Sequence, residues 1–299
     1  MKGTIIKALS GFYYVRNFNW TIYECTAKGS FRNDEITPLV GDEVDFDVTS
    51  TFNRTGVINE ISPRKNSLVR PAVANVDQAM VVFALDNPKP NFSILDRFLV
   101  LMQKQNIETF IVFNKKDLAR TDDIKKIKKM YKNAGCKLFF VQAGGDTPHL
   151  FWLKMKLRGK ITVMAGPSGV GKSTMLNVFA GKVGDDMAAV GEISKKIGRG
   201  KHTTRHNEIY SFKKNSIHII DTPGFTSLLV NEDDFTKEEL QNAFPEFAEF
   251  KGQCKFANCN HIKQRDCAIE KAVLDGKISQ SRYNSYKSIY GEIKSQKKY

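Results

Sequence analysis

Residues 161–180 read ITVMAGPSGVGKSTMLNVFA, and this stretch decides the fold of the middle of the chain. An apolar run is followed by GPSGVGKS, which matches Gly-x4-Gly-Lys-Ser, and then by a helical pattern. Glycines let backbone N–H groups wrap around phosphate oxygens, and a helix that begins at the loop adds a favourable dipole. The stretch therefore predicts a strand, a phosphate-binding loop and a helix within an α/β sheet.

The loop and the start of the helix supply the candidate phosphate ligands. Lys172 would reach the β- and γ-phosphates, and the hydroxyl of Ser173 would bind Mg²⁺. The full set assigned to nucleotide binding in this stretch is Gly166, Pro167, Ser168, Gly169, Val170, Gly171, Lys172, Ser173 and Thr174.

A second acidic motif follows about 50 residues further on. Asp221-Thr-Pro-Gly224 comes directly after the apolar run SIHII, at the expected end of a strand. Asp221 would hold Mg²⁺ through water, and the N–H of Gly224 would contact the γ-phosphate. Alone, this tetrapeptide indicates only a turn. Its position at a strand end, about 50 residues beyond the phosphate loop, is what supports the assignment to a GTPase motif.

The base-binding candidate lies upstream of the phosphate loop. Asn114, Lys115, Lys116 and Asp117 end the run ETFIVF, and an Asp carboxylate can accept both N–H groups on one edge of guanine. The next apolar run, CKLFFV, ends in the polar loop 142–144, a second candidate for base contact. The resulting order of motifs is that of a GTPase cut and rejoined elsewhere, which is possible because domain termini often lie close together.

Three modules are predicted, over residues 1–70, 71–229 and 230–299. The first contains about five short antiparallel strands, which suit a small closed barrel of the OB type; an SH3-like barrel is the alternative. Strands and helices then alternate, as in a parallel sheet covered on both faces. The last module is mainly helical. Pro63 and Pro71 bracket an expected linker.

The charge of the chain favours a polyanionic partner. The 299 residues carry a formal net charge of +14, and residues 71–229 hold 25 basic residues against 13 acidic ones. Nucleic acid suits this excess better than a membrane, although a solvated lysine-rich surface would also produce it. No apolar run approaches the ~20 residues that span a bilayer, so a cytoplasmic location is expected.

Three of the five cysteines gather near the C-terminus. Cys254, Cys259, His261 and Cys267 provide three thiolates and one imidazole, which is the donor set of a closed structural zinc site. Cys25 and Cys136 lie far away in the sequence and are expected to be core thiols.

Together these features resemble the RsgA (YjeQ) family of GTPases that depend on the small ribosomal subunit. The resemblance covers essentially the whole chain. The segments on which the resemblance rests are RPAVANVDQ (70–78), NKKD, GPSGVGKS, GRGKHTTR (198–205), DTPG and the C-terminal Cys/His set.

The resemblance implies further site residues in GRGKHTTR. Thr204, with Thr203 as the alternative, would complete the Mg²⁺ shell. Phe225 follows DTPG where many GTPases carry a water-orienting Gln, so His202 is the candidate for positioning the attacking water. The alternative for His202 is a solvent-exposed histidine without a catalytic role.

The implied function is GTP hydrolysis by a factor that binds the small (30S) ribosomal subunit and its rRNA during late assembly or maturation. GTP or GDP with Mg²⁺ and one structural Zn²⁺ are the expected cofactors, and a monomer is expected. The alternative is a nucleotide-gated rRNA-binding clamp in which hydrolysis is incidental. An ATPase or kinase conflicts with Asp117.

Overall fold

The fold is known from a computed structural model. No helix within the ranges given next is both long and apolar enough to span a bilayer. The structure describes residues 1–29, 31, 36–69, 71–145, 148–181, 207–212, 216–221 and 235–296.

These residues form two compact units that each combine separate stretches of the chain. The chain passes from the first unit to the second between Met80 and Val81, and the phosphate loop 166–171 belongs to the second unit. The first unit comprises 1–80, 143–165 and 172–224, and the second comprises 81–142, 166–171 and 225–299. The three-module division expected from the sequence remains a prediction.

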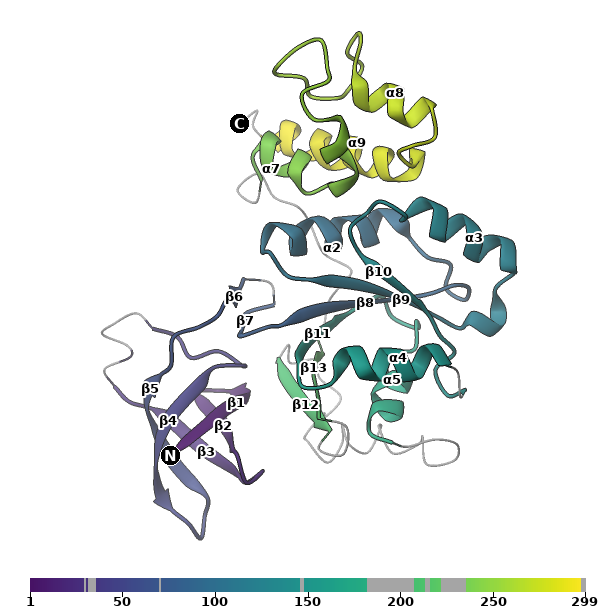
Figure 1. The fold of residues 1–299 in the computed structure, drawn as a ribbon. Coiled ribbons are helices and arrows are strands. Elements are labelled where there is room, and N and C mark those ends of the chain that lie inside the picture. Colours follow the sequence, from purple (N-terminus) through teal and green to yellow (C-terminus); the bar gives the residue numbers. More distant parts are fainter. Residues whose placement is uncertain are drawn as a thin grey trace. The chain divides into compact units, whose positions relative to one another are not determined.

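A closed five-stranded barrel occupies the N-terminal part of the first unit (Figure 1). The strands pair in the order β1-β2-β3-β5-β4, and β4 closes onto β1. This confirms the predicted OB-type barrel, but β3 and β5 run parallel rather than antiparallel. The strands are β1 (Lys2–Leu9), β2 (Phe12–Asn17), β3 (Ile22–Ala27), β4 (Glu43–Ser50) and β5 (Thr55–Ile61).

Alternating apolar residues of these strands fill the barrel interior. Ile5, Val15, Cys25, Phe46 and Ile58 each have no exposed surface. Since successive side chains of a strand point to opposite faces, the period-two pattern of the sequence is the pattern of this core.

The expected linker is a packed hairpin. Strand β6 (Ser67–Leu68) pairs with β7 (Val73–Ala74), and the side chain of Leu68 is buried. Residues 64–69 therefore belong to the first unit rather than forming an extended spacer.

The remainder of the first unit continues the sheet beyond β1. Strand β13 lies between β11, to which it is parallel, and β12, to which it is antiparallel. Strand β12 also pairs with β1 through Glu208 and Lys7. The elements are α4 (Pro148–Leu157), β11 (Ile161–Ala165), α5 (Lys172–Phe179), β12 (Glu208–Phe212) and β13 (Ile217–Asp221).

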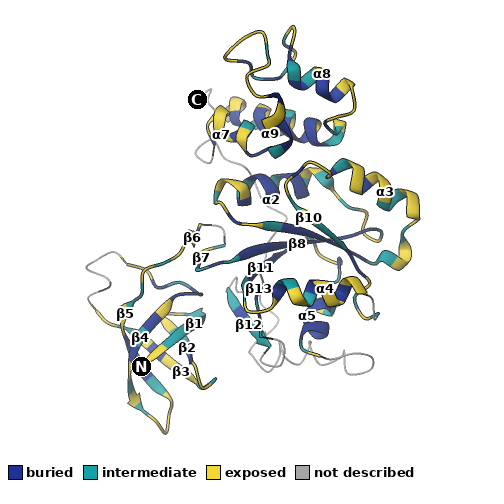
Figure 2. Cartoon of the chain, viewed as in Figure 1, coloured by how far each residue is buried: buried dark blue, intermediate teal, exposed yellow. Residues whose placement is uncertain are grey.

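The second unit is built on parallel strands in the order β10-β9-β8. Every residue of β8 is buried, which matches a strand covered on both faces (Figure 2). Helix α2 begins at Asn91, whose side chain accepts from the Ile94 N–H at 3.2 Å. The elements are β8 (Gln78–Ala84), α2 (Phe92–Lys104), β9 (Thr109–Asn114), η1 (Lys116–Leu118), α3 (Thr121–Met130) and β10 (Lys137–Phe140).

The C-terminal segment packs on α2 within the same unit (Figure 1). Val100 of α2 shares a hydrophobic core with residues of the four helices described within 235–296, including Leu240, Phe247, Ile269 and Tyr286. The helical content predicted for the C-terminal segment is confirmed. Its helices are α7 (Lys237–Asn242), η6 (Pro245–Phe250), α8 (Ala268–Leu274) and α9 (Gln280–Gln296).

A buried ionic network joins this module to the strand-and-helix part of the second unit. Arg282 of α9, 1% exposed, donates to Asp96 of α2 at 2.7 Å and to both carboxylate oxygens of Glu246 at 2.7 and 3.2 Å. The hydroxyl of Tyr131 donates to the same Asp96 oxygen at 2.9 Å. The guanidinium also lies 4.7 Å from the centre of the Phe244 ring. One cation therefore pairs with two buried carboxylates from different segments.

Replacing Arg282 with Met should lower the free energy of unfolding by about 3–5 kcal/mol, because it leaves Asp96 and Glu246 buried without their counter-ion. The measurement is urea unfolding followed by circular dichroism. Arg97→Met is the matched control, because Arg97 pairs with the half-exposed Glu292 and the loss there should be about 0–1 kcal/mol. Adding Asp96→Asn and Glu246→Gln to Arg282→Met should recover part of the loss. Equal effects of the two arginine substitutions would contradict this role.

Candidate functional site

The phosphate loop and the base motif contact each other inside the second unit. The side-chain amide of Asn114, 3% exposed, donates to the backbone carbonyl of Val170 at 2.9 Å. Gly171 has a φ of 96°, and a Cβ there would lie 2.3 Å from the Asn114 amide nitrogen. A Cβ at Gly166 would lie 2.2 Å from the carbonyl oxygen of Val82 in β8. Glycine is therefore required at both ends of the loop by close packing as well as by conformation.

The NKKD segment leaves β9 in a sharp turn. Lys115 adopts a left-handed conformation with a φ of 58°, and its ammonium group donates to the carbonyl of Asn87. The Lys116 N–H donates to the carbonyl of Val141 at 3.1 Å, which ties the turn to the end of the neighbouring strand. Asp117 follows at the start of η1 with an exposed side chain, available to a ligand.

The two strand ends predicted to supply base contacts are thus neighbours. β9 and β10 pair in parallel, and Val141 immediately precedes the predicted second loop, 142–144. This is the arrangement in which ligands bind beyond the carboxyl ends of parallel strands. Asn114 itself holds the phosphate loop, a role that the motif did not indicate.

The first unit contains the side chains predicted to contact the phosphates and Mg²⁺. Lys172 and Ser173 begin α5, and Asp221 ends β13. Burial lowers the pKa of Lys172, and the carboxylate of Asp221 opposes this shift, so the two groups interact electrostatically. Ser173 is exposed. A hydroxyl and a carboxylate at adjacent element ends are oxygen donors of the kind that Mg²⁺ prefers, so these residues fit that ion.

Several predicted site residues lie outside the described part of the chain. They are His202, Thr203, Thr204, Gly224 and Phe225. Their roles remain predictions.

The four zinc-ligand candidates come together in the loop before α8. The donor atoms of Cys254, Cys259, His261 and Cys267 all lie within 4.8 Å of one another. The sulfur atoms of Cys254 and Cys267 lie 3.5 and 3.6 Å from Nδ1 of His261. In a tetrahedral site with Zn–S near 2.3 Å and Zn–N near 2.1 Å, this separation would be about 3.6 Å. The donor set and its spacing therefore fit zinc.

Hydrogen bonds from the surrounding helices hold the backbone of this loop. Tyr283 of α9 donates to the carbonyl of His261 at 2.7 Å, and Tyr286 donates to that of Asn260 at 2.8 Å. Gln241 of α7 donates to the carbonyl of Cys259 at 3.0 Å. These contacts fix the backbone that carries the candidate ligands, as hydrogen bonds around metal sites generally do.

The loop has an irregular conformation that needs such support. His261, Lys263 and Asp266 have φ values of 58°, 48° and 57°, which cost of order 1–3 kcal/mol each outside glycine. In the metal-free chain, burial raises the pKa of the Cys267 thiol to about 12. A bound divalent cation reverses this effect, because it stabilises the thiolate.

The other two cysteines are separate from this cluster. Cys25 is buried in the barrel, where burial raises its pKa to about 11, and Cys136 is half-buried with a pKa raised by burial to about 12. Neither has the depressed pKa of a reactive thiol.

Comparison with known proteins finds an N-terminal domain followed by a GTPase domain. The family model for the RsgA N-terminal domain matches residues 2–58, and the model for the RsgA GTPase matches residues 61–231. Two curated relatives are both named Small ribosomal subunit biogenesis GTPase RsgA. The protein from Agathobacter rectalis is 44% identical and that from Alkaliphilus metalliredigens 45% identical; each comparison covers all of this chain and at least 99% of the relative.

Solved structures of circularly permuted GTPases and of YjeQ match nearly the whole chain. YloQ, described as a circularly permuted GTPase, matches with a TM-score of 0.75 and 35% identity over 99% of this chain and 95% of its own. YjeQ from Thermotoga maritima matches with a TM-score of 0.77 and 33% identity over 98% of both chains. The family models, the full-length relatives and the fold agree, and the chain belongs to the RsgA GTPase family, with its GTPase motifs in circularly permuted order.

Proposed function

We propose that this protein hydrolyses GTP and acts on the small ribosomal subunit during its late assembly or maturation. The observation that carries the nucleotide assignment is the buried hydrogen bond from Asn114 to Val170. It joins a guanine-type motif to a phosphate loop. In the sequence the motif precedes the loop, which is the reverse of the usual GTPase order.

Different residues would bind the base and the phosphates of the nucleotide. Asp117, exposed beside the loop, would accept the two N–H groups on one edge of guanine. The loop 166–171 would surround the phosphates with backbone N–H groups, and Lys172, which follows directly, would contact the β- and γ-phosphates. Lys115 and Lys116 would shape the base pocket rather than contact phosphate, since their backbone is fixed by the turn.

Catalysis would depend on positioning and electrostatics, as in phosphoryl transfer generally. Ser173, Thr204 and, through water, Asp221 would hold Mg²⁺, which when bound would supply positive charge beside the phosphates. The positive charge of Lys172 would stabilise the negative charge that develops on the transferred group. His202 would position the attacking water, because Phe225 replaces the glutamine that often has this role.

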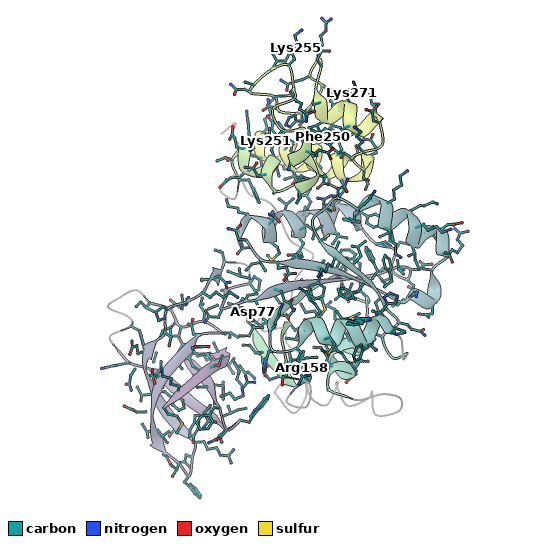
Figure 3. All side chains as sticks on the ribbon, viewed as in Figure 1. Asp77, Arg158, Phe250, Lys251, Lys255 and Lys271 are labelled. Atoms are coloured by element: carbon teal, nitrogen blue, oxygen red, sulfur yellow. The ribbon has the colours of Figure 1, made fainter. Side chains whose placement is uncertain are left out.

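The ribosomal partner is proposed from the relatives and from charge. The curated relatives are named for biogenesis of the small ribosomal subunit. This chain has a formal net charge of +14, which favours binding to the phosphate backbone of rRNA. On the C-terminal module, Lys251, Lys255 and Lys271 are exposed (Figure 3). We infer that this module contacts rRNA phosphates, and that the protein works as a cytoplasmic monomer.

The Cys/His cluster is proposed to hold one structural zinc. All four positions of a tetrahedral ion would be filled by protein ligands, which leaves none for a reacting water. The ion would hold an irregular loop on α7 and α9.

In single-turnover assays, purified small subunits should raise the rate of GTP hydrolysis by about tenfold or more, a barrier change of ~1.4 kcal/mol. Unstimulated turnover would instead favour the clamp, in which nucleotide binding controls rRNA affinity. Lys172→Ala should abolish the stimulated rate, because it removes the cation at the phosphates.

The matched control alters recognition of the nucleotide base and leaves the residues assigned to hydrolysis unchanged. Asp117→Asn should lose stimulated hydrolysis of GTP and regain it with xanthosine triphosphate, whose altered edge suits a side-chain amide. Retention of full GTP selectivity in this variant would refute the base assignment.

Zinc analysis tests the metal site separately. The purified protein should contain about one zinc per chain, and Cys259→Ser should lose it and unfold at a lower temperature, because structural zinc contributes directly to folding. Cys136→Ser is the control, since this thiol lies outside the cluster, and it should keep the metal. Full zinc content in Cys259→Ser, measured by atomic absorption, would rule out this site.

A further inference from the structure

Helix α4 of the first unit exposes a strip of large apolar side chains. Phe151, Trp152 and Met155 are 58%, 62% and 46% exposed. Residues three and four positions apart share a helix face, so these side chains lie along one side of α4. An exposed apolar patch on a soluble domain marks a surface that binds another molecule. We call Phe151, Trp152 and Met155 the α4 strip.

The opposite face of the same helix is already buried. Leu150, Leu153 and Leu157 are buried, and α4 packs on β13 (Figure 2). A helix that covers a core is apolar on one face, whereas a helix that is apolar on both faces is normally buried on both. Helix α4 has the second pattern, and within the described part of the chain its leucine face is the covered one.

The C-terminal end of α4 is fixed to its own unit. The side-chain amide of Gln78 donates to the carbonyl of Lys156 at 3.0 Å. Just beyond the helix, the Gly159 N–H donates to the carbonyl of Ser216 at 2.7 Å. Because these bonds hold the helix in place, a partner would bind a surface that is ordered before binding and would pay little for ordering it.

The geometry of the two rings favours a protein partner over nucleic acid. Phe151 and Trp152 meet edge to face, with ring centres 5.5 Å apart and an interplanar angle of 75°. Successive bases stack on parallel ring faces, which this pair does not offer. A corner between two rings instead accommodates one aliphatic or aromatic side chain, and Trp, Phe and Met are enriched in the cores of protein interfaces.

The charges around the α4 strip define the chemistry of that partner. Residues 148–161 carry four cations and no acidic residue, the cations being Lys154, Lys156, Arg158 and Lys160. At about 100° per residue, Lys154 and Lys156 fall on opposite sides of the strip. Arg158, labelled in Figure 3, follows the helix and is exposed. A second copy of this helix would place like charges opposite each other, whereas carboxylates would complement them.

We propose that α4 docks an acidic amphipathic helix of a protein partner. An apolar side chain of that helix fills the corner between Phe151 and Trp152, and its carboxylates lie against the flanking cations. This is helix recognition by an apolar surface with charged borders, in which the aromatic anchors supply affinity and the charges supply specificity. The surface goes beyond the proposed hydrolysis and contains none of the residues assigned to nucleotide, magnesium or zinc.

A labelled peptide tests this docking surface directly. The probe is a fluorescein-labelled helical peptide of about 15 residues, with leucines on one face and glutamates on the other. Titration with the full-length protein, without nucleotide, should raise the fluorescence anisotropy to saturation with a Kd of about 10 µM or lower. Trp152→Ala should raise the Kd by about tenfold or more and Phe151→Ala by about fivefold or more, because both remove an anchor.

Phe52→Ala is the matched control, because Phe52 is 95% exposed in the barrel loop between β4 and β5. It should change the Kd by less than about twofold. Arg158→Glu should weaken binding by about threefold or more, and a peptide with lysines in place of the glutamates should bind the unaltered protein about tenfold more weakly. The replaced side chains are exposed, and circular dichroism checks that each variant keeps its fold.

Several outcomes would overturn the proposal. They are the absence of saturable binding, equal weakening by Phe52→Ala, and equal affinity for the glutamate and lysine peptides. A uridine oligonucleotide or phosphatidylglycerol vesicles whose binding is lost in Trp152→Ala would assign the α4 strip to nucleic acid or membrane instead. A dimer that Trp152→Ala dissociates in sedimentation equilibrium would assign it to a second copy. Because the titration omits nucleotide and ribosomes, failure of the hydrolysis assay leaves this result interpretable.

Discussion

The proposed nucleotide site is held together by a buried hydrogen bond, from the amide of Asn114 to the carbonyl of Val170 at 2.9 Å. These residues come from segments that meet only in the folded chain. The bond fixes the phosphate loop against the end of β9, and the absence of a Cβ at Gly171 makes that approach possible. Binding a nucleotide requires its base and phosphate contacts to be held at a fixed spacing, and connectivity is irrelevant to that spacing. A permuted order of motifs can therefore form the same kind of site.

The permutation has a consequence for the C-terminal module. In this order the module follows the Asp-Thr-Pro-Gly motif, yet it packs on α2, which lies early in the chain. Arg282 makes this attachment specific, because it places one charge between Asp96 and Glu246 in a space closed to water. An apolar interface would tolerate sliding, whereas a buried charge with two fixed partners favours a single arrangement. We expect the module and α2 to move together, and zinc to act on the same body by ordering the loop beside α9.

The elements that follow a simple period were predictable from the sequence. The barrel strands alternate, β8 is apolar throughout, and the Cys/His spacing leads to four donors in one place. The parallel pairing of β3 with β5 was not predictable, because barrel closure, rather than local pattern, determines it. The contact from Asn114 to Val170 was also not predictable from the sequence, because the motif indicates that Asn114 contacts the base rather than the phosphate loop. Arg282 gave no signal at all, because its partners are 36 and 186 residues away.

Isothermal titration of GDP into Asn114→Ala tests most directly whether the base motif and the phosphate loop form one site. Removing the donor to a buried carbonyl costs about 1–3 kcal/mol, so the Kd for GDP should rise by about tenfold to a hundredfold. Asn133→Ala, which removes an exposed amide from the same unit, should leave the Kd unchanged. An unaltered Kd for GDP in Asn114→Ala would show that the two motifs do not depend on each other, and would contradict the account.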